Sequence, residues 1–205
     1  VDHYIGEILT ALEESGQADN TWVIYNSDHG EMLGDHMMSH KIVFYDEAVR
    51  VPLIVRPPGG TNAWQSEALT DVLGVTNSMV EIAGAKPLEN SAGTSFVSQV
   101  NAGPDAEGAQ VGKDAVVSEV LGHTMVYDGR FKLAVEVDTE TPVELYDVET
   151  DPKEVNNRFQ DPELADVRND LIEDHLKPIR SRLDESRLEN WHEVRANKKR
   201  LVDVK

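Results

Sequence analysis

The sequence predicts an α/β fold, in which a mixed sheet with flanking helices is followed by a small antiparallel sheet packed with a helix. The first 85 residues alternate helical and strand patterns, which is typical of a sheet covered by helices. Short β-branched runs separated by turn residues then follow between residues 115 and 148, as in an antiparallel sheet. After residue 161 apolar side chains recur every three to four residues, which predicts a helix.

The first element is a helix over residues 2–15, because its isoleucines and leucines recur at helical spacing. Asp2 is the candidate N-cap, and Gly16 is the candidate C-terminal stop. We expect one face of this helix to pack on the rest of the protein. Since the helix begins almost at the first residue, which is Val1, we expect the chain to be part of a longer protein.

Two strands and a second helix follow. Residues 20–26 are β-branched and aromatic and apolar on both sides, as in a buried parallel strand, and they run into a polar loop at residues 27–30. Residues 51–55 form a second strand with Pro52 near its start. Residues 75–82 have the pattern of a helix.

The composition changes at residues 89–114, which are rich in small and polar residues and lack periodicity, so we expect a connecting loop region there. The predicted domains are therefore residues 1–88 and residues 115–205. The second is a small α+β subdomain with terminal helices.

In this subdomain we expect strands over residues 115–121, 124–137 and 143–148, the middle one broken by a turn at Asp128-Gly129. A helix starts near residue 161, and Pro178 ends or kinks it. Beyond Pro178 the chain is charged, and we expect it to be helical.

The composition excludes several classes of function. The 205 residues carry a net charge of -19, which disfavours binding to nucleic acid. The longest apolar run has about five residues, against the roughly 20 that cross a bilayer, so no membrane span is expected. No cysteine is present, so disulfides, thiolate metal sites and cysteine nucleophiles are excluded within this chain.

Asp28 and His29 are the candidate metal ligands. They are adjacent at the end of a predicted strand, where open α/β sheets place their sites, and both side chain types bind divalent cations. We expect Gly30 to relax the backbone so that the two side chains can turn toward one point. Without other evidence, the alternative is that Asp28 caps a turn and His29 is a surface histidine.

The stretch Ser27-Asp-His-Gly-Glu-Met-Leu-Gly-Asp-His36, followed by Lys41 and the segment 45–54, resembles the sulfatase family of the alkaline phosphatase superfamily. Two later segments resemble the family's C-terminal motifs, Asp128-Gly-Arg-Phe-Lys-Leu133 and the segment 144–157. The resemblance implies that Asp28 and His29 bind a metal ion and that Lys41 contacts the sulfate of the substrate. It also implies that residues 1–88 are the C-terminal part of an α/β catalytic domain.

The family's nucleophile motif, Cys or Ser followed by x-Pro-x-Arg, is absent. The string Leu176-Lys-Pro-Ile-Arg180 has the same spacing, but leucine is no nucleophile. The resemblance implies that a formylglycine, made from the Cys or Ser of that motif, lies in a missing N-terminal half. We therefore expect the chain alone to be inactive.

For the metal we expect calcium first, because aspartate oxygens suit a hard cation, while the histidine also suits manganese or zinc. His36, His40 and His123 are further candidates for leaving-group protonation or substrate contact, although loop histidines often have no such role. We expect Glu47 and Arg50 to pair structurally. Gly74 and Asn77 replace the aspartate and proline of a family helix start, a difference we assign to packing.

The first functional hypothesis is a metal-dependent sulfatase acting on sulfate esters, with sulfated carbohydrates among the substrates. The second is a phosphonate monoester or phosphodiester hydrolase of the same superfamily. The third is a non-catalytic metal- or carbohydrate-binding module. A periplasmic or secreted location agrees with the resemblance to bacterial sulfatases.

Overall fold

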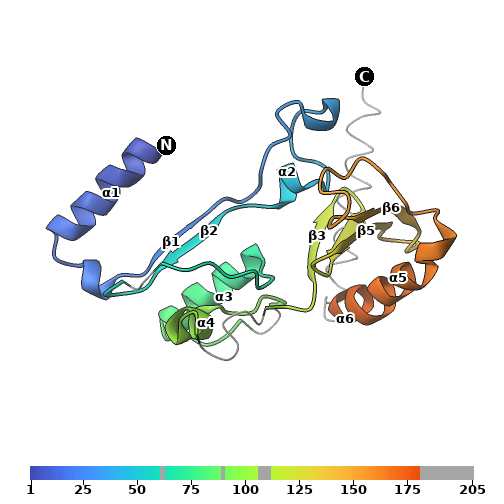
Figure 1. Ribbon diagram of the computed structural model, residues 1–205. Coiled ribbons are helices and arrows are strands. Elements are labelled where there is room, and N and C mark those ends of the chain that lie inside the picture. Colours follow the sequence, from blue (N-terminus) through green and yellow to red (C-terminus); the bar gives the residue numbers. More distant parts are fainter. Residues whose placement is uncertain (61–62, 89–90, 106–111, 181–205) are drawn as a thin grey trace, which may run out of the picture.

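A computed structural model describes residues 1–60, 63–88, 91–105 and 112–180. The described chain forms a two-stranded antiparallel ribbon and a four-stranded antiparallel sheet, with helices beside each (Figure 1). The chain after Arg180, where we expect further helix, lies outside the described residues. No helix of the described part is long and apolar enough to cross a membrane.

The first helix, α1, spans Asp2–Glu14, and Gly16 follows it with a φ of +72°. Val1 occupies the N-cap position and no side chain caps the helix, so the prediction of Asp2 as the N-cap is wrong. None of the α1 residues is buried, and the helix stands apart from the four-stranded sheet in Figure 1. Arg56 ties its C-terminal end to strand β2 by an ion pair with Glu13 at 3.7 Å.

After the 3₁₀ turn Ala18–Asn20, strand β1 (Val23–Asn26) pairs with β2 (Leu53–Arg56). The pairing is antiparallel, so the prediction that residues 20–26 form a buried parallel strand is wrong. Tyr25 is 40% exposed and Ile54 is 64% exposed. The apolar composition of residues 20–26 does predict a strand. The direction of its partner is set by pairing with residues at least 27 positions away in the sequence, which local composition does not reveal.

Helix α2 (Asp46–Val49) lies between β1 and β2 in the sequence, and helices α3 (Val72–Ile82) and α4 (Val97–Ala102) lie between β2 and the four-stranded sheet. Helix α3 begins three residues before its predicted start with Asp71 as the N-cap. Helix α4 lies inside the stretch expected to be a connecting loop region. Phe96 and Val97 at its start are buried, so this stretch contributes side chains to the interior of the protein.

The second sheet has the order β3-β4-β5-β6, formed by Val116–Val120, His123–Tyr127, Phe131–Glu136 and Pro142–Asp147. All neighbours are antiparallel, as the sequence predicts, and a bulge lies between Ala134 and Val135. Side chains alternate along a strand, so every second residue points to one face of the sheet and the residues between them point to the opposite face.

One face of this sheet packs on the C-terminal helices. The core there contains Val126, Leu133, Leu145, Leu171 and Leu176, each at most 2% exposed. Burying one such leucine stabilises the fold by about 1.5–3 kcal/mol. The other face carries Met125 and Ala134, which pack with Phe44 from the loop before α2.

The helical region after the sheet is continuous in sequence but changes its hydrogen bonding. A 3₁₀ turn (Pro162–Leu164) leads into α5 (Ala165–Asp170), the π-helical turn Leu171–Leu176 and α6 (Lys177–Arg180). The helix thus continues past Pro178 rather than ending there. A π-helical register is one way to accommodate a residue that lacks a backbone N–H.

Candidate active site

The predicted site residues come together on the loop that links β1 to α2. Asp28 and His29 lie two and three residues after β1, and Lys41 lies five residues before α2. The loop returns on itself, because the Met32 amide donates to the His40 carbonyl at 3.0 Å. This return brings Lys41 to His29, so that Lys41 Nζ contacts His29 Nε2.

Gly30 holds this loop against α2. Its amide donates to the Ala48 carbonyl at 2.8 Å, and a Cβ at this position would lie 1.9 Å from the Glu47 carbonyl oxygen. We expected Gly30 to provide backbone freedom, but it is absent from the glycines with positive φ. A glycine is needed here because the two backbones approach closely.

The orientation of the His29 ring is set by its own loop. Nδ1 lies 2.7 Å from the Gly30 carbonyl oxygen, which can only accept, so Nδ1 carries the proton in this hydrogen bond. In a neutral ring Nε2 then carries the lone pair. Nε2 contacts Lys41 Nζ, so a cation bound to this nitrogen would take the place of that contact.

Asp28 supplies a second ligand atom beside this nitrogen. Asp28 Oδ2 lies 3.3 Å from His29 Nε2, and the side chain of Asp28 is 83% exposed. Its other oxygen accepts from the His29 amide at 3.0 Å, which fixes the carboxylate. Asp28, His29 and Lys41 therefore form one exposed cluster of a carboxylate, an imidazole and an ammonium group.

This donor set fits a divalent cation. Two ligand atoms at right angles around a cation about 2.3–2.4 Å away lie about 3.3 Å apart, which is the separation of Asp28 Oδ2 and His29 Nε2. Among the described residues, no group of three His, Asp or Glu side chains could hold a metal ion. Asp28 and His29 alone would leave most of the coordination of a bound cation to other ligands.

The other candidate histidines have different environments. The His36 ring stacks on Tyr45 with 3.8 Å between ring centroids and 10° between planes. For His40 the contact within the loop is made by the backbone, whose amide donates to Glu31 Oε1. His123 starts β4 on the neighbouring sheet. None of these contacts assigns a catalytic role.

The four-stranded sheet reaches the same loop. Tyr146 on β6 approaches Tyr45, with 3.4 Å between the two hydroxyl oxygens. Burial, and then the hydrogen bond to Tyr45, raises the pKa of Tyr146, and burial also raises the pKa of Glu144 on the same strand. These groups lie beside the His36 stack, so the sheet forms one wall next to the loop.

The strongest link between sheet and loop was missed by the sequence analysis. Lys132 Nζ on β5 lies 2.5 Å from Asp46 Oδ1 and 2.7 Å from Glu154 Oε1. The side chains of Lys132 and Glu154 are 4% and 1% exposed. Both residues fall within the two C-terminal segments that resemble the family, and this was the available signal for them.

The expected pairing of Glu47 with Arg50 is wrong. Arg50 lies 3.5 Å from Asp46, one turn before it on α2, and Glu47 lies 3.5 Å from Lys153. Residues four apart on a helical turn lie on the same side, which brings Arg50, the residue after α2, to Asp46. Glu47 faces the segment after β6, where Lys153 lies.

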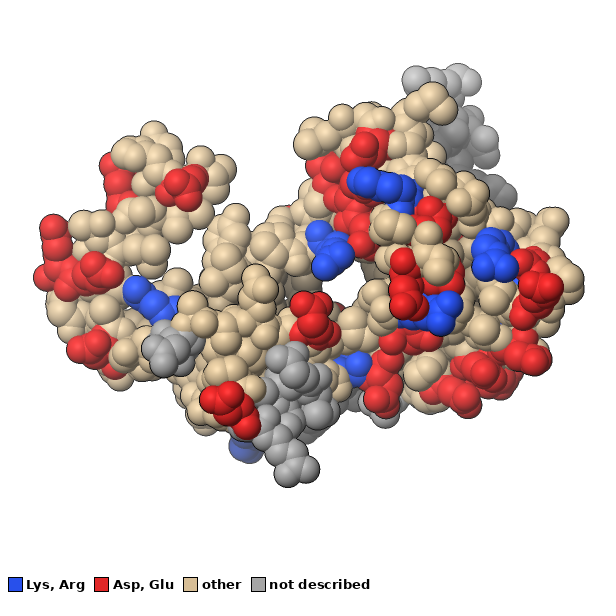
Figure 2. Space-filling view, viewed as in Figure 1, with Lys and Arg blue, Asp and Glu red and all other residues tan. Residues whose placement is uncertain are grey.

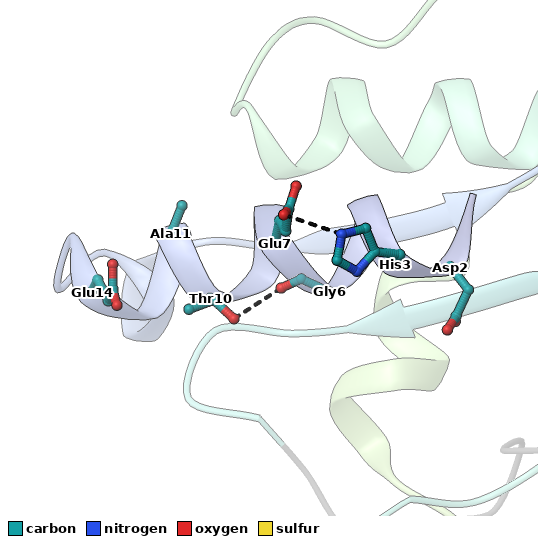
Figure 3. A pocket seen from close by; sticks show the side chains of 7 residues that line it. All are labelled: Asp2, His3, Gly6, Glu7, Thr10, Ala11 and Glu14. Atoms are coloured by element: carbon teal, nitrogen blue, oxygen red, sulfur yellow. Dashed lines mark hydrogen bonds and ion pairs between the residues drawn. The ribbon is translucent and has the colours of Figure 1, made fainter.

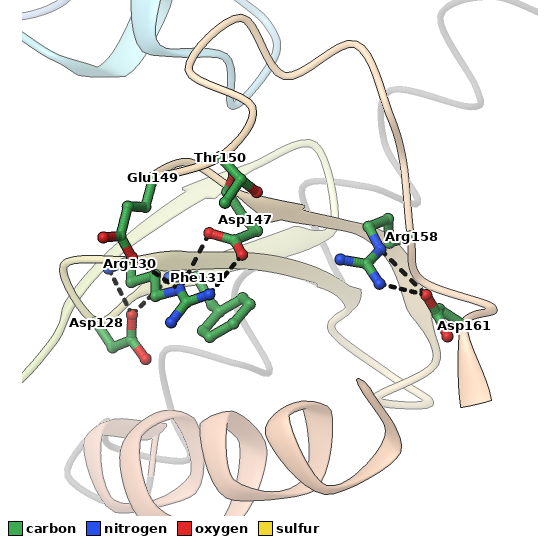
Figure 4. A network of polar contacts seen from close by, with 8 residues as sticks. All are labelled: Asp128, Arg130, Phe131, Asp147, Glu149, Thr150, Arg158 and Asp161. Atoms are coloured by element: carbon green, nitrogen blue, oxygen red, sulfur yellow. Dashed lines mark hydrogen bonds and ion pairs between the residues drawn. The ribbon is translucent and has the colours of Figure 1, made fainter. Parts of the chain in front are cut away.

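A separate polar network closes the end of the β5–β6 pair (Figure 4). Arg130 donates to both carboxylate oxygens of Asp147, at 3.1 and 2.8 Å, and the hydrogen bond from Arg130 holds the pKa of Asp147 below its ordinary value. Asp128 Oδ1 accepts from the amides of Arg130 and Phe131, which fixes the turn. These contacts are structural.

The charges and hollows elsewhere do not extend the site. Figure 2 shows acidic side chains over much of the visible face, with lysines and arginines among them, in agreement with the net charge of -19. A shallow hollow on α1 is lined by seven residues of that helix, from Asp2 to Glu14, with His3 paired to Glu7 at 3.3 Å (Figure 3). It contains none of the predicted site residues.

Comparison with known proteins identifies the family. A profile of the family described as Sulfatase matches residues 1–85. The uncharacterized sulfatase YidJ of Escherichia coli strain K12 is 32% identical over 189 residues, which cover 88% of this chain and 37% of that protein. The chain belongs to the sulfatase family. It spans about a third of the length of the curated relatives it matches, since it covers 37% of YidJ and 35% of arylsulfatase K from Xenopus laevis.

Solved structures agree with the sulfatase assignment and establish the sulfatase and alkaline phosphatase-like fold. BT4656, solved in complex with its substrate D-glucosamine-2-N,6-O-disulfate, superimposes with a TM-score of 0.76 at 27% identity, covering 89% of this chain and 38% of that one. A phosphonate monoester hydrolase from Silicibacter pomeroyi gives the same TM-score of 0.76 at 25% identity, covering 90% of this chain and 39% of that one. The fold predicted from the sequence is therefore confirmed.

Proposed function

We propose that the complete protein hydrolyses sulfate esters, and that this part of the sulfatase supplies two metal ligands, Asp28 and His29, and a sulfate-binding lysine, Lys41. The observation that carries the proposal is the convergence of these three side chains. Lys41 Nζ contacts His29 Nε2, and Asp28 Oδ2 lies 3.3 Å from the same nitrogen. A cation and an anionic sulfate need this combination of ligand and ammonium groups side by side.

The roles of the three residues follow from their chemistry. In the reaction the S–O bond to the alcohol breaks, the oxygen of water ends on sulfur, and the alcohol leaves with a proton. Lys41 would bind the negatively charged sulfate oxygens and oppose the charge that develops during transfer. Asp28 and His29 would hold the metal, whose chemical contribution when bound is to polarise a sulfate oxygen.

Further parts of the site would come from outside this chain. Asp28 and His29 offer two ligand atoms, whereas calcium takes six to eight oxygen ligands, so most of the coordination must come from other residues, substrate or water. We propose calcium as the metal, with manganese or zinc as alternatives. A formylglycine nucleophile, which sulfatases make from Cys or Ser, would also come from the rest of the protein.

Two substrate classes are supported to different degrees. BT4656 is solved with a doubly sulfated glucosamine, which supports a sulfated carbohydrate as the substrate of this protein. The phosphonate monoester hydrolase superimposes equally well, which supports phosphonate monoesters or phosphodiesters as the alternative. The relatives by sequence are sulfatases, and for this reason we place sulfate esters first.

The deciding experiment compares leaving-group-matched substrates. The complete protein, loaded with Ca²⁺, is assayed on the sulfate ester, the phosphate diester and the phenylphosphonate monoester of 4-nitrophenol, and on glucosamine 6-sulfate. We expect kcat/KM to be highest for the sulfate esters. A higher kcat/KM for the phosphonate monoester or the diester would replace the first function by the second, and no turnover of any of them would favour a non-catalytic module.

A further inference from the structure

A buried ion cluster joins the four-stranded sheet to the helix beside the site. The cluster consists of Asp46, Lys132 and Glu154. Lys132 and Glu154 are almost fully buried, and Glu154 Oε2 accepts from the Asp46 amide at 2.7 Å. Asp46 is the first residue of α2, and the N-cap residue Tyr45 makes no side-chain cap. Glu154 therefore provides, from 108 residues away, the acceptor that a capping side chain normally provides.

The helix in turn contacts the metal-ligand loop directly. The Ala48 carbonyl of α2 accepts from the Gly30 amide at 2.8 Å, and the absence of a Cβ at Gly30 allows the two backbones to approach this closely. The Gly30 carbonyl accepts from His29 Nδ1 at 2.7 Å. Three hydrogen bonds, joined by the backbone of α2 and of Gly30, thus connect Glu154 to the His29 ring.

The backbone conformation of Glu154 is unfavourable for a residue that has a side chain. Glu154 has a φ of +51°, a left-handed conformation that glycine adopts most readily and that glutamate rarely adopts. A glycine would relieve this strain, yet the position holds a long carboxylate that reaches Lys132 and the Asp46 amide. The contacts of the side chain offset the unfavourable backbone.

We propose that Glu154 is a positioning residue, which orients His29 toward the metal by fixing the start of α2 and, through α2, Gly30. This proposal rests on the proposed metal site. It assigns to the C-terminal sheet a role in metal binding, although the sheet supplies no ligand.

The test measures Ca²⁺ affinity and local hydrogen exchange in the complete protein. Glu154→Gly relieves the backbone strain but removes a buried partner of Lys132, so a purely structural role predicts a lower melting temperature with unchanged Ca²⁺ affinity and unchanged Gly30 exchange. We expect instead that Ca²⁺ affinity, measured by competition with a fluorescent chelator, falls about tenfold, the lower end for residues that orient metal ligands. In the metal-free protein the Gly30 amide should exchange faster. Glu154→Gln, which keeps one acceptor oxygen, should show a smaller effect in both measurements.

The matched control is Asp147→Ala. Asp147 is also a buried carboxylate of the same sheet region, 6% exposed at its side chain and paired with Arg130. We expect it to lower the melting temperature while Ca²⁺ affinity and Gly30 exchange stay within twofold of wild type.

The outcomes separate the two proposals. Normal Ca²⁺ affinity and normal Gly30 exchange in folded Glu154→Gly or Glu154→Gln, or an equal loss in Asp147→Ala, would overturn the positioning role. If Glu154→Gly does not fold, Glu154→Gln decides. Should Asp28→Ala bind Ca²⁺ as well as wild type, the metal site itself is wrong, while the exchange of the Gly30 amide still reports on the contact from Glu154.

Discussion

His29 has one ring nitrogen engaged by its own backbone and the other directed at Lys41. The hydrogen bond from Nδ1 to the Gly30 carbonyl selects the tautomer, and the adjacent Asp28 carboxylate is held by the His29 amide. The side chains of the two proposed metal ligands are therefore held by hydrogen bonds within their own loop. Groups that are already held in place lose less entropy on binding, which would favour the proposed metal site.

We predict that Asp28→Ala in the complete protein weakens Ca²⁺ binding severely, because it removes the anionic ligand atom beside His29 Nε2. Elemental analysis after dialysis should find little retained metal. Asp35→Ala, at an exposed aspartate of the same loop, is the control and should retain the wild-type metal content. Unchanged metal content in Asp28→Ala would contradict the assignment.

We predict that Lys41→Ala keeps the metal but lowers kcat/KM about 10²–10³-fold, the usual effect of removing one group that stabilises transition-state charge. The measurement is a steady-state assay on 4-nitrophenyl sulfate, with metal content determined in parallel. Lys86→Ala changes another exposed lysine and should be as active as wild type. Equal rates for Lys41→Ala and wild type, at low and at saturating substrate, would exclude a role for Lys41 in binding sulfate.

Which residues could be predicted depends on their separation in the sequence. Asp28, His29 and Lys41 lie within 14 positions and carry a family spacing, so the sequence was sufficient to propose them. The partners of Asp46 lie 86 and 108 positions away, and a lysine or glutamate shows no sequence pattern that reveals burial. Their pairing could only be found in three dimensions.

At the scale of elements, α2 is four residues long and stands between the site loop and the sheet. A helix this short is not stable by its own hydrogen bonds. Its position depends on Glu154 at its start and on Gly30 along its side. A change at either contact should therefore move α2 and, with it, the loop that carries His29.

We predict that Gly30→Ala destabilises the protein by about 1–3 kcal/mol, because the new methyl group would overlap the Glu47 carbonyl and force the loop away from α2. At about 2–4 °C per kcal/mol, the value for domains of roughly 150–250 residues, the melting temperature should fall by several degrees. Gly6→Ala is the matched control. It lies on exposed α1 with no atom within 4 Å of the added Cβ, and should stabilise by about 0.5–1 kcal/mol. A Gly30→Ala variant with the wild-type melting temperature would contradict the close contact.

The elements differ in how far the sequence determined them. The strands of the four-stranded sheet were predicted because they are joined by short turns, such as that at Asp128-Gly129, which leave only antiparallel neighbours possible. Strands β1 and β2 are separated by 26 residues, and local residue preferences do not fix the direction of such a pairing. Helix α4 was missed because its six residues are too few to show helical periodicity.

For the molecule as a whole, Asp147 is a paired carboxylate that contributes to the response of stability to acid. Arg130 holds the pKa of Asp147 below the ordinary value of about 3.9. The folded state therefore binds the proton of this group less readily than the unfolded state. The stabilisation is present above the unfolded pKa and is lost as the pH falls through the folded pKa.

We predict that Asp147→Asn lowers the melting temperature at pH 7 and that its difference from wild type shrinks as the pH falls below about 4, where the wild-type carboxylate also becomes neutral. Thermal unfolding followed by circular dichroism between pH 7 and pH 2 measures this. Asp19→Asn, at an exposed aspartate, should follow the wild-type curve throughout. A constant difference between Asp147→Asn and wild type across the range would show that the charge of Asp147 contributes nothing.

The alternation of side chains along β5 has an evolutionary consequence. Leu133 faces the helices and its neighbour Lys132 faces the site, so one strand contributes to both the hydrophobic core and the ion cluster. An inserted or deleted residue in the turn between β4 and β5 that carried into the strand pairing would shift the register by one and exchange the two faces. Lys132 would then point into the core and Leu133 toward Glu154. We therefore expect this turn to tolerate substitutions more readily than changes in length.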